Sequence, residues 1–265
     1  MSDMTTLTVR VKRQDGPNAP SRWEEFTVPR SKYASSNALS VLMQIRENPV
    51  TTDGKPTSAP AFDAACLEEV CGSCTMLVNG KVRQGCTALV SEYSPNGEPL
   101  TLEPMTKFPL VRDLCVDRAV MFESLIKVKA WIPIDGTYNL GPGPRQSQTL
   151  QADRYLMSTC MTCGCCLEVC PQVNEHSAFI GAAAINQTRL FNDHPTGEMN
   201  EADRLHALMD EGGIGDCGKA GNCVLACPKE IPLTTSIAAM NRATIVQGLK
   251  DFFTNDPEKK HGGQP

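Results

Sequence analysis

Hydrophobic and polar residues alternate near the start of the chain, and a second run of apolar residues follows the turn-rich segment Gln14 to Ser21. Alternation with a period of two is typical of strands that bury one face. The pattern therefore predicts a β-hairpin. Its apolar positions are Leu7, Val9, Val11, Trp23, Phe26 and Val28.

The segment after this hairpin changes to helical spacing and ends near Asn48-Pro49. Apolar residues that recur every third or fourth position lie on one face of a helix, so we predict an amphipathic helix here. The residues that carry the spacing are Ala38, Val41, Leu42 and Ile45.

A second hairpin is predicted at Asn79-Gly80, a dipeptide that tolerates positive φ and suits a type I′ turn. Thr75 to Val78 precedes the turn and Lys81 to Gln84 follows it, and a further strand is expected from Leu100 to Glu103. Together with the first hairpin and the helix, these strands make a compact α+β domain, which we place at residues 1–106.

The remaining residues, 107–265, are predicted to form a mainly α-helical domain. An amphipathic run starts at Arg112, continues through Leu114, Asp117, Val120 and Met121, and reaches about Lys129. The Gly- and Pro-rich stretch Asn139 to Arg145 predicts a loop. Further helices are expected over Ser177 to Leu190, Glu201 to Met209 and Thr235 to Leu249.

Charge and hydropathy limit the function classes. A net charge of −5 and a pI near 5.5 argue against binding of nucleic acid, which requires a basic surface. No apolar run approaches the roughly 18 residues of a membrane span, and residues 1–10 have no apolar signal-peptide core. We therefore expect a chain that stays in the cytoplasm or wherever a partner holds it.

Thirteen cysteines in a chain of 265 residues call for another explanation than disulfides, which are typical of small secreted domains. Metal ligation is the better interpretation. The first group has the C-x₄-C-x₂-C spacing of plant-type [2Fe–2S] sites, with a fourth cysteine across the second hairpin. Gly72 and Ser73 suit a backbone that wraps tightly around the cluster. The group consists of Cys66, Cys71, Cys74 and Cys86.

An imperfect internal repeat holds the other cysteines. The run C-x₂-C-x₂-C-x₃-C-P, which has the bacterial ferredoxin spacing, recurs with an offset of 57 residues, and its second cysteine is replaced by Ala220 in the second copy. The first copy contains Cys160, Cys163, Cys166, Cys170 and Pro171, and the second contains Cys217, Ala220, Cys223, Cys227 and Pro228.

In this motif three cysteines ligate one cubane and the fourth ligates the other cluster. The first site is then a [4Fe–4S] cluster bound by Cys160, Cys163, Cys166 and Cys227. The second site is left with the three thiolates of Cys170, Cys217 and Cys223. Because Ala220 cannot ligate iron, this corner is either empty, which gives a more oxidising [3Fe–4S] cluster, or filled by water or substrate.

Several alternatives remain open from the residues alone. Water or substrate at the Ala220 corner would give a catalytic iron, and the protein would then be a hydro-lyase. Structural zinc also uses cysteine pairs, and with zinc the chain would be an interaction module. Cys165 and Cys115, the latter on the predicted amphipathic helix, are interpreted as packing residues. The histidines His176, His194, His206 and His261 show no ligand spacing, so surface or capping roles are expected.

The order of these motifs resembles the iron–sulfur subunit of succinate:quinone oxidoreductases, the succinate dehydrogenase and fumarate reductase family. The resemblance covers nearly the whole chain and is strongest to the menaquinone-linked, Gram-positive-type branch. Beyond the cysteines it rests on Arg112-Asp-Leu114, Val116-Asp117, Arg189-Leu-Phe191, His194-Pro-Thr-Gly197 and Pro228-Lys-Glu-Ile-Pro232.

The resemblance implies an N-terminal β-grasp [2Fe–2S] ferredoxin domain followed by a helical, bacterial-ferredoxin-like domain. It implies the same ligand sets, with [3Fe–4S] at the three-thiolate site, and electron transfer from FAD of a flavoprotein subunit through [2Fe–2S], [4Fe–4S] and [3Fe–4S] to quinone. The quinone site would be shared with a membrane-anchor cytochrome b subunit that carries any haem b. The chain would then lie peripherally on the cytoplasmic face of the membrane, and no catalytic residue of its own is expected.

One departure from the family concerns the quinone. Ubiquinone-linked relatives have tryptophans shortly after the first Cys-Pro and a histidine after the first cysteine of the second motif, whereas this chain has Asn174, Glu175 and Gly218. This difference favours menaquinone as acceptor. Pro171 is retained and is expected to border the quinone site. Fumarate reduction, with the electrons running in reverse, is the alternative within the family.

Overall fold

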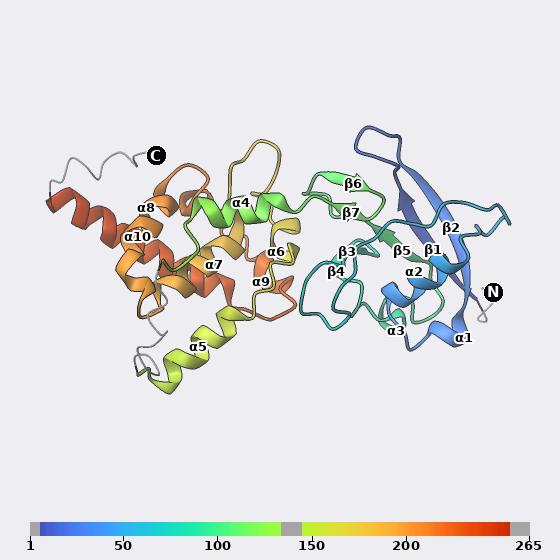
Figure 1. Ribbon diagram of the computed structural model, residues 1–265, viewed down its shortest axis with the longest axis horizontal. Coiled ribbons are helices and arrows are strands. Elements are labelled where there is room, and N and C mark those ends of the chain that lie inside the picture. The colour runs from blue at the N-terminus through green and yellow to red at the C-terminus, as the bar shows by residue number, and fades with distance from the viewer. Residues whose placement is uncertain (1–5, 134–144, 255–265) are drawn as a thin grey trace. The chain divides into compact units, whose positions relative to one another are not determined.

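The computed structural model describes residues 6–133 and 145–254 (Figure 1). Its residues form two compact units. The first extends to Arg118 and includes Met161–Glu168, and the second comprises Ala119–Cys160 and the chain from Val169 onward. The boundary between residues 106 and 107 expected from the sequence stays a prediction.

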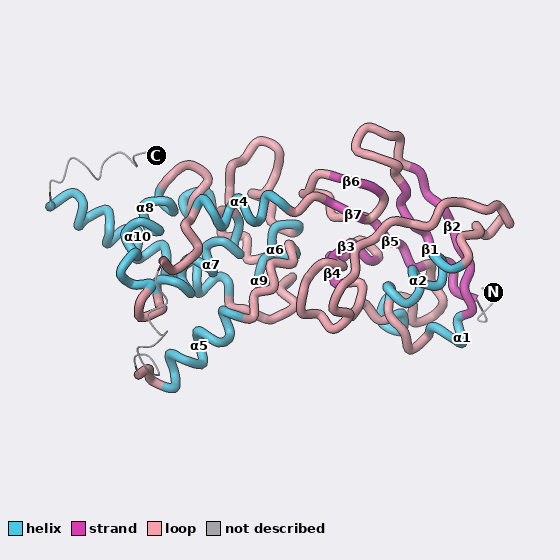
Figure 2. The backbone as a smooth tube through the Cα atoms, in the orientation of Figure 1, coloured by secondary structure: helices cyan, strands magenta, loops and turns pink. Residues whose placement is uncertain are grey.

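The first unit is built on a five-stranded sheet in the order β2-β1-β5-β3-β4 (Figure 2). β1 pairs with β5 in parallel, while the β1–β2, β3–β5 and β3–β4 pairs are antiparallel. Both predicted hairpins and the last strand are therefore confirmed. The strands are β1 (Thr6–Arg13), β2 (Arg22–Pro29), β3 (Thr75–Val78), β4 (Lys81–Gln84) and β5 (Leu100–Glu103).

The alternating pattern explains why this sheet has one buried face. Leu7, Val9 and Val11 of β1 are completely buried in the core. Asn79 and Gly80 have φ of 48° and 75° between β3 and β4, as the predicted type I′ turn requires.

The predicted amphipathic helix is α2 (Ala38–Glu47), which lies against β2 (Figure 1). The side chain of Asn37 caps its N-terminus by accepting a 2.9 Å hydrogen bond from the backbone N–H of Ser40. Two short helices, α1 (Arg30–Tyr33) and α3 (Val90–Tyr93), complete this part of the unit.

The prediction that a helix begins at Arg112 is wrong. Residues 110–116 form a small antiparallel pair, β6 (Leu110–Arg112) and β7 (Cys115–Val116), and the helix α4 covers only Ala119–Lys127. Asp113 has a φ of +48°, which no helix interior accepts. Cys115 accordingly lies half-buried on a strand and not on a helix.

The second unit is helical, as predicted (Figure 2). The long helix α10 packs against α7 and α8, and α5 also packs against α7. The helix expected from Ser177 begins four residues later, because the backbone N–H of Ile180 bonds to the carbonyl of Gly212 and not within a helix. The elements of the second unit are α4, α5 (Gln148–Ser158), α7 (Gly181–Asn192), η1 (Gly197–Asn200), α8 (Glu201–Met209), η2 (Ile214–Asp216), α9 (Asn222–Leu225) and α10 (Leu233–Thr254).

Two sequence predictions concern residues at the edge of what the structure describes. The loop expected at Asn139 to Arg145 lies, apart from its last residue, outside the described residues, as does His261. Within residues 6–133 and 145–254, no helix is long and apolar enough to cross a membrane.

Candidate iron–sulfur sites

The first cysteine loop, residues 66–74, directs its backbone amides toward sulfur. The N–H groups of Glu68, Val70 and Cys71 lie 3.3–3.4 Å from Sγ of Cys66. Leu67 and Glu69 adopt positive φ, 62° and 54°, and these turns allow several amides to face inward. Hydrogen bonds to thiolate sulfur are a standard feature of iron–sulfur sites, so the loop fits a cluster.

The other cysteines of this group lie in the same region. The β3–β4 hairpin brings Cys86 beside Cys74, and the backbone N–H of Gly85 donates to the Cys74 carbonyl at 2.9 Å. Both side chains are buried. Cys71 lies close enough to Cys66 for a hydrogen bond between the two side chains. The structure therefore gathers the cysteines in two neighbouring pairs.

The acidity of Cys71 favours the thiolate form that ligates iron. Partial burial raises its pKa, but the hydrogen bonds from Ser73 and Cys66 together outweigh that effect and lower the pKa to about 6. Burial raises the pKa of Cys74 to about 12, so this thiol needs a positive charge such as iron to lose its proton near neutral pH.

The second cysteine loop, residues 161–168, belongs to the same unit as the first. It ends in the short helix α6 (Cys165–Glu168), preceded by Gly164 with φ of +90°. A Cβ at Gly164 would lie 2.9 Å from the Phe108 ring, so both the conformation and the space require glycine. Glu168 anchors the helix by accepting hydrogen bonds from the backbone amides of Thr106 and Lys107.

Within this loop the neighbouring cysteines have different partners. Cys165 is buried and accepts a 3.2 Å hydrogen bond from Nε2 of Gln84, which agrees with its predicted packing role. A hydrogen bond from Cys165 outweighs the effect of burial and lowers the pKa of Cys163 to about 7. Cys166 is also buried, while Cys160 and Cys227 are half-buried residues of the second unit, after α5 and α9.

The three-thiolate group lies at a cavity of about 430 Å³ within the second unit. Cys170, Cys217 and Cys223 all line it, and Ala220 lines it as well. Ala220 is exposed, whereas Cys223 is buried, so the alanine lies on the open side of the cavity. The walls are completed by Pro171, Gln172, Phe179, Ala182, Gly218, Lys219, Gly221, Asn222, Thr234, Ile237, Ala238 and Asn241.

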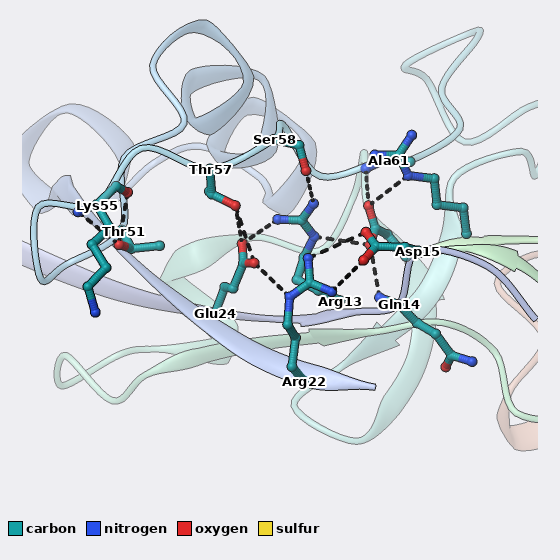
Figure 3. Close-up of polar contacts among 12 residues, drawn as sticks. Arg13, Gln14, Asp15, Arg22, Glu24, Thr51, Lys55, Thr57, Ser58 and Ala61 are labelled. Carbon is teal, nitrogen blue, oxygen red and sulfur yellow. Dashed lines mark hydrogen bonds and ion pairs between the residues drawn. The ribbon is translucent and has the colours of Figure 1, made fainter. Parts of the chain in front are cut away.

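Asp113, in the Arg112-Asp-Leu114 motif, is a structural anchor of the first unit. Its buried carboxylate accepts 2.9 Å hydrogen bonds from the backbone amides of Gln14 and Ala61 and pairs with Arg13 at 3.0 Å. Figure 3 shows Arg13 between Glu24 on one side and Gln14 and Ala61 on the other. The hydroxyl of Ser58 also accepts a hydrogen bond from the Arg13 guanidinium. The segment that leads from Ala61 into the first cysteine loop is thereby fixed.

The described histidines lie in separate surroundings, and His206 pairs with a carboxylate of another helix instead of taking the expected surface or capping role. Nδ1 of His194 accepts a 3.2 Å hydrogen bond from the backbone amide of Thr196, and His206 lies 2.8 Å from Asp251. His176 is exposed. Among the residues that the structure describes, no group of three or more His, Cys, Asp and Glu side chains is arranged to hold a single metal ion.

Comparison with protein families matches both halves of the chain. Residues 8–123 match the 2Fe-2S iron-sulfur cluster binding domain, and residues 156–231 match the 4Fe-4S dicluster domain. Together with the cysteine loops, these matches define an iron–sulfur protein with a [2Fe–2S] domain followed by a [4Fe–4S] dicluster domain.

Relatives identify the family. The chain is 54% identical over 256 residues to the succinate dehydrogenase iron-sulfur subunit of Bacillus subtilis (strain 168), covering 97% of this chain and 99% of the relative. It is 28% identical to the fumarate reductase iron-sulfur subunit of Wolinella succinogenes, over 90% of this chain and 97% of the relative. A chain of the Mycobacterium smegmatis Sdh1 complex in the apo form has the same fold, with a TM-score of 0.73 at 23% identity, over 96% of this chain and 99% of that one.

The chain belongs to the succinate dehydrogenase iron–sulfur subunit family. It is an electron-transfer subunit of a larger oxidoreductase. The family, the α+β fold class and the electron-transfer role predicted from the sequence are thereby confirmed, as are the [2Fe–2S] and [4Fe–4S] domains.

Proposed function

We propose that this chain passes electrons from the FAD of a flavoprotein subunit to menaquinone at a membrane-anchor cytochrome b subunit. Succinate is oxidised at the flavin, and this chain supplies the cluster ligands between the two partners. In this proposal the chain lies peripherally on the cytoplasmic face of the membrane, held by the anchor. The direction follows the 54% identical relative, a succinate dehydrogenase subunit.

The ligand assignment is part of the proposal. Amide groups around Cys66 and the low pKa of Cys71 support the first site. The bacterial ferredoxin spacing supports the second and third sites. The sets are Cys66, Cys71, Cys74 and Cys86 for [2Fe–2S], Cys160, Cys163, Cys166 and Cys227 for [4Fe–4S], and Cys170, Cys217 and Cys223 for [3Fe–4S].

The observation that carries the proposal is the cavity lined by three cysteines and Ala220. An alanine side chain offers no ligand to a fourth iron, which supports a [3Fe–4S] cluster at this site. Cluster type and net charge help to set the reduction potential, so a three-iron cluster is suited to be the last and more oxidising member of the chain.

The residues at positions 174, 175 and 218, which differ from those of ubiquinone-linked relatives, support menaquinone as the acceptor. Pro171, which we propose borders the quinone site, lines the same cavity beside Gly218. A Cβ at Gly218 would lie 2.4 Å from Nε2 of Gln172, so the Gln172 amide occupies the space that a larger residue would need. A histidine at position 218, as in ubiquinone-linked relatives, would require Gln172 to move.

Low-temperature EPR of the purified complex tests the assignment. We expect an oxidised-state [3Fe–4S] signal and reduced-state [2Fe–2S] and [4Fe–4S] signals. Ala220→Cys should convert the third cluster to [4Fe–4S] and lower its potential, which slows menaquinone reduction while flavin reduction by succinate stays normal. The control Ala220→Val fills the position without sulfur and should keep three irons. An unchanged EPR spectrum in Ala220→Cys would contradict the placement of the open corner.

A further inference from the structure

Two cysteine loops of the first unit are in direct backbone contact. Gly72, between Cys71 and Cys74, is buried and has φ of +68°. A Cβ at Gly72 would lie 2.8 Å from both Cα and Cβ of Cys163, closer than real side-chain atoms approach. The loop proposed to bind [2Fe–2S] therefore touches a residue proposed to bind [4Fe–4S], and only glycine permits the contact.

One side chain binds both loops at this contact. The guanidinium of Arg118 donates from Nη1 to the carbonyl of Gly72 and from Nη2 to the carbonyl of Thr162. Because the guanidinium is planar and rigid, its two donors fix the separation of the two carbonyls. Arg118 is half-buried, which strengthens such charge-assisted hydrogen bonds relative to those in water.

A second connection approaches the same carbonyl from the sheet. The hydroxyl of Thr75 donates to the Gly72 carbonyl at 2.7 Å and accepts from Nε2 of Gln84 at 3.1 Å. The same amide nitrogen donates to Sγ of Cys165 at 3.2 Å. Thr75 and Gln84 are both buried. The first loop is therefore tied to the second on both sides of the Gly72 carbonyl.

We propose that Arg118 is a positioning residue for electron transfer, which holds the [2Fe–2S] loop against the [4Fe–4S] loop at the Gly72–Cys163 contact. The proposal rests on the ligand assignment above. The step at this junction is the transfer of one electron. The [2Fe–2S] cluster is oxidised by one electron and the [4Fe–4S] cluster is reduced by one electron, and no bond is formed or broken. What the protein contributes is the distance between the two sites.

The expected effect follows from the hydrogen bonds. Loss of one hydrogen bond from a charged donor lowers the equilibrium constant for the held arrangement by about tenfold, or 1.4 kcal/mol at 25 °C. Arg118→Met removes both donors, whereas Arg118→Lys retains the charge but cannot bridge two carbonyls in a fixed geometry. We expect a large effect from the first substitution and an intermediate effect from the second.

The test uses the purified complex. In dithionite-reduced samples, the microwave power that half-saturates the [2Fe–2S] EPR signal reports magnetic coupling to the neighbouring cluster. We expect this power to fall several-fold in Arg118→Met and partly in Arg118→Lys, at unchanged iron and sulfide content. Menaquinone reduction should fall in the same order, while transfer from flavin to an artificial acceptor should not. Arg10→Met is the control, because Arg10 pairs with Glu25 on β2.

Several results would overturn the proposal. One is a half-saturation power in Arg118→Met equal to that of the wild type. Another is an Arg118→Lys variant whose half-saturation power and menaquinone reduction both equal those of the wild type. The third is an effect in Arg10→Met as large as that in Arg118→Met. If Arg118→Met fails to assemble, Gly72→Ala decides, since its added Cβ must push Cys163 away, and unchanged coupling there would refute the junction. Absence of either EPR signal from the wild-type complex would instead refute the ligand assignment.

Discussion

Replacement of Asp113 by alanine tests whether a buried ion pair holds the first cysteine loop in place. Asp113 and Arg13 both have fully buried side chains and pair at 3.0 Å. Removal of the carboxylate also leaves the backbone amides of Gln14 and Ala61 without their acceptor. Since Ala61 precedes the loop that begins at Cys66, we expect the [2Fe–2S] site to loosen together with the sheet.

The magnitude follows from the partners that remain. Breaking a buried ion pair by removing one member costs about 3–5 kcal/mol, because the other charge stays buried. Arg13 keeps Glu24 and Ser58 as partners, which favours the lower end, about 3 kcal/mol. For a unit of this size, that corresponds to a fall in the melting temperature of roughly 11 °C.

Heating the purified complex while following the visible circular dichroism of the [2Fe–2S] cluster measures this change. Arg22→Met is the matched control, because Arg22 belongs to the same network but pairs with the exposed Asp15 and should leave the melting temperature unchanged. Equal melting temperatures for Asp113→Ala and the wild type would refute the reasoning. A loss confined to the [4Fe–4S] signal would refute the link to the first loop.

Three further substitutions have definite expectations. Arg204→Met should destabilise the second unit by about 3 kcal/mol, because the buried guanidinium donates to the carbonyls of Gly197 and Trp131. Calorimetry measures this loss, and no change in the unfolding free energy would mean that these carbonyls find other donors. Asn37→Ala removes the cap of α2 and should cost about 1 kcal/mol in thermal melting, with Asn96→Ala, at an exposed position, as the neutral control. Cys165→Ala should keep full iron and sulfide content by chemical assay, whereas Cys166→Ser should lose the [4Fe–4S] signal; iron loss in the former would contradict the packing role.

Much of the fold could be predicted because its local signals agree with its tertiary structure. Alternation predicted β1, the turn-rich segment after it predicted β2 as its partner, and Asn79-Gly80 predicted the turn between β3 and β4. The error at Arg112 has a physical cause. Residues 110–116 have apolar spacing that fits a helix, but Asp113 forms long-range bonds to Gln14 and Ala61, and these bonds require a backbone conformation that spacing alone cannot reveal.

The candidate sites were predictable only as far as cysteine spacing reaches. Spacing predicted that Cys170, Cys217 and Cys223 come together, and all three line one cavity. The roles of Arg118 and Gln84, by contrast, have no signal in the sequence. Arg118 binds backbone carbonyls, and Gln84 binds the side chain of Cys165, which is distant in the sequence. Such contacts become visible only when the loops are folded.

These contacts share a physical reason. The cysteine loops contain many residues with positive φ and cannot be held by regular backbone hydrogen bonding or by a broad apolar face. Their carbonyls and amides must still be satisfied where they are buried. Asp113 and Arg118 meet this need by binding backbone groups in or next to the loops, and Glu168 ties the end of the second loop to the backbone amides of Thr106 and Lys107. The side chains that fix the cluster sites are therefore polar residues of the surrounding fold, and their substitution should disturb the clusters although none of them ligates iron.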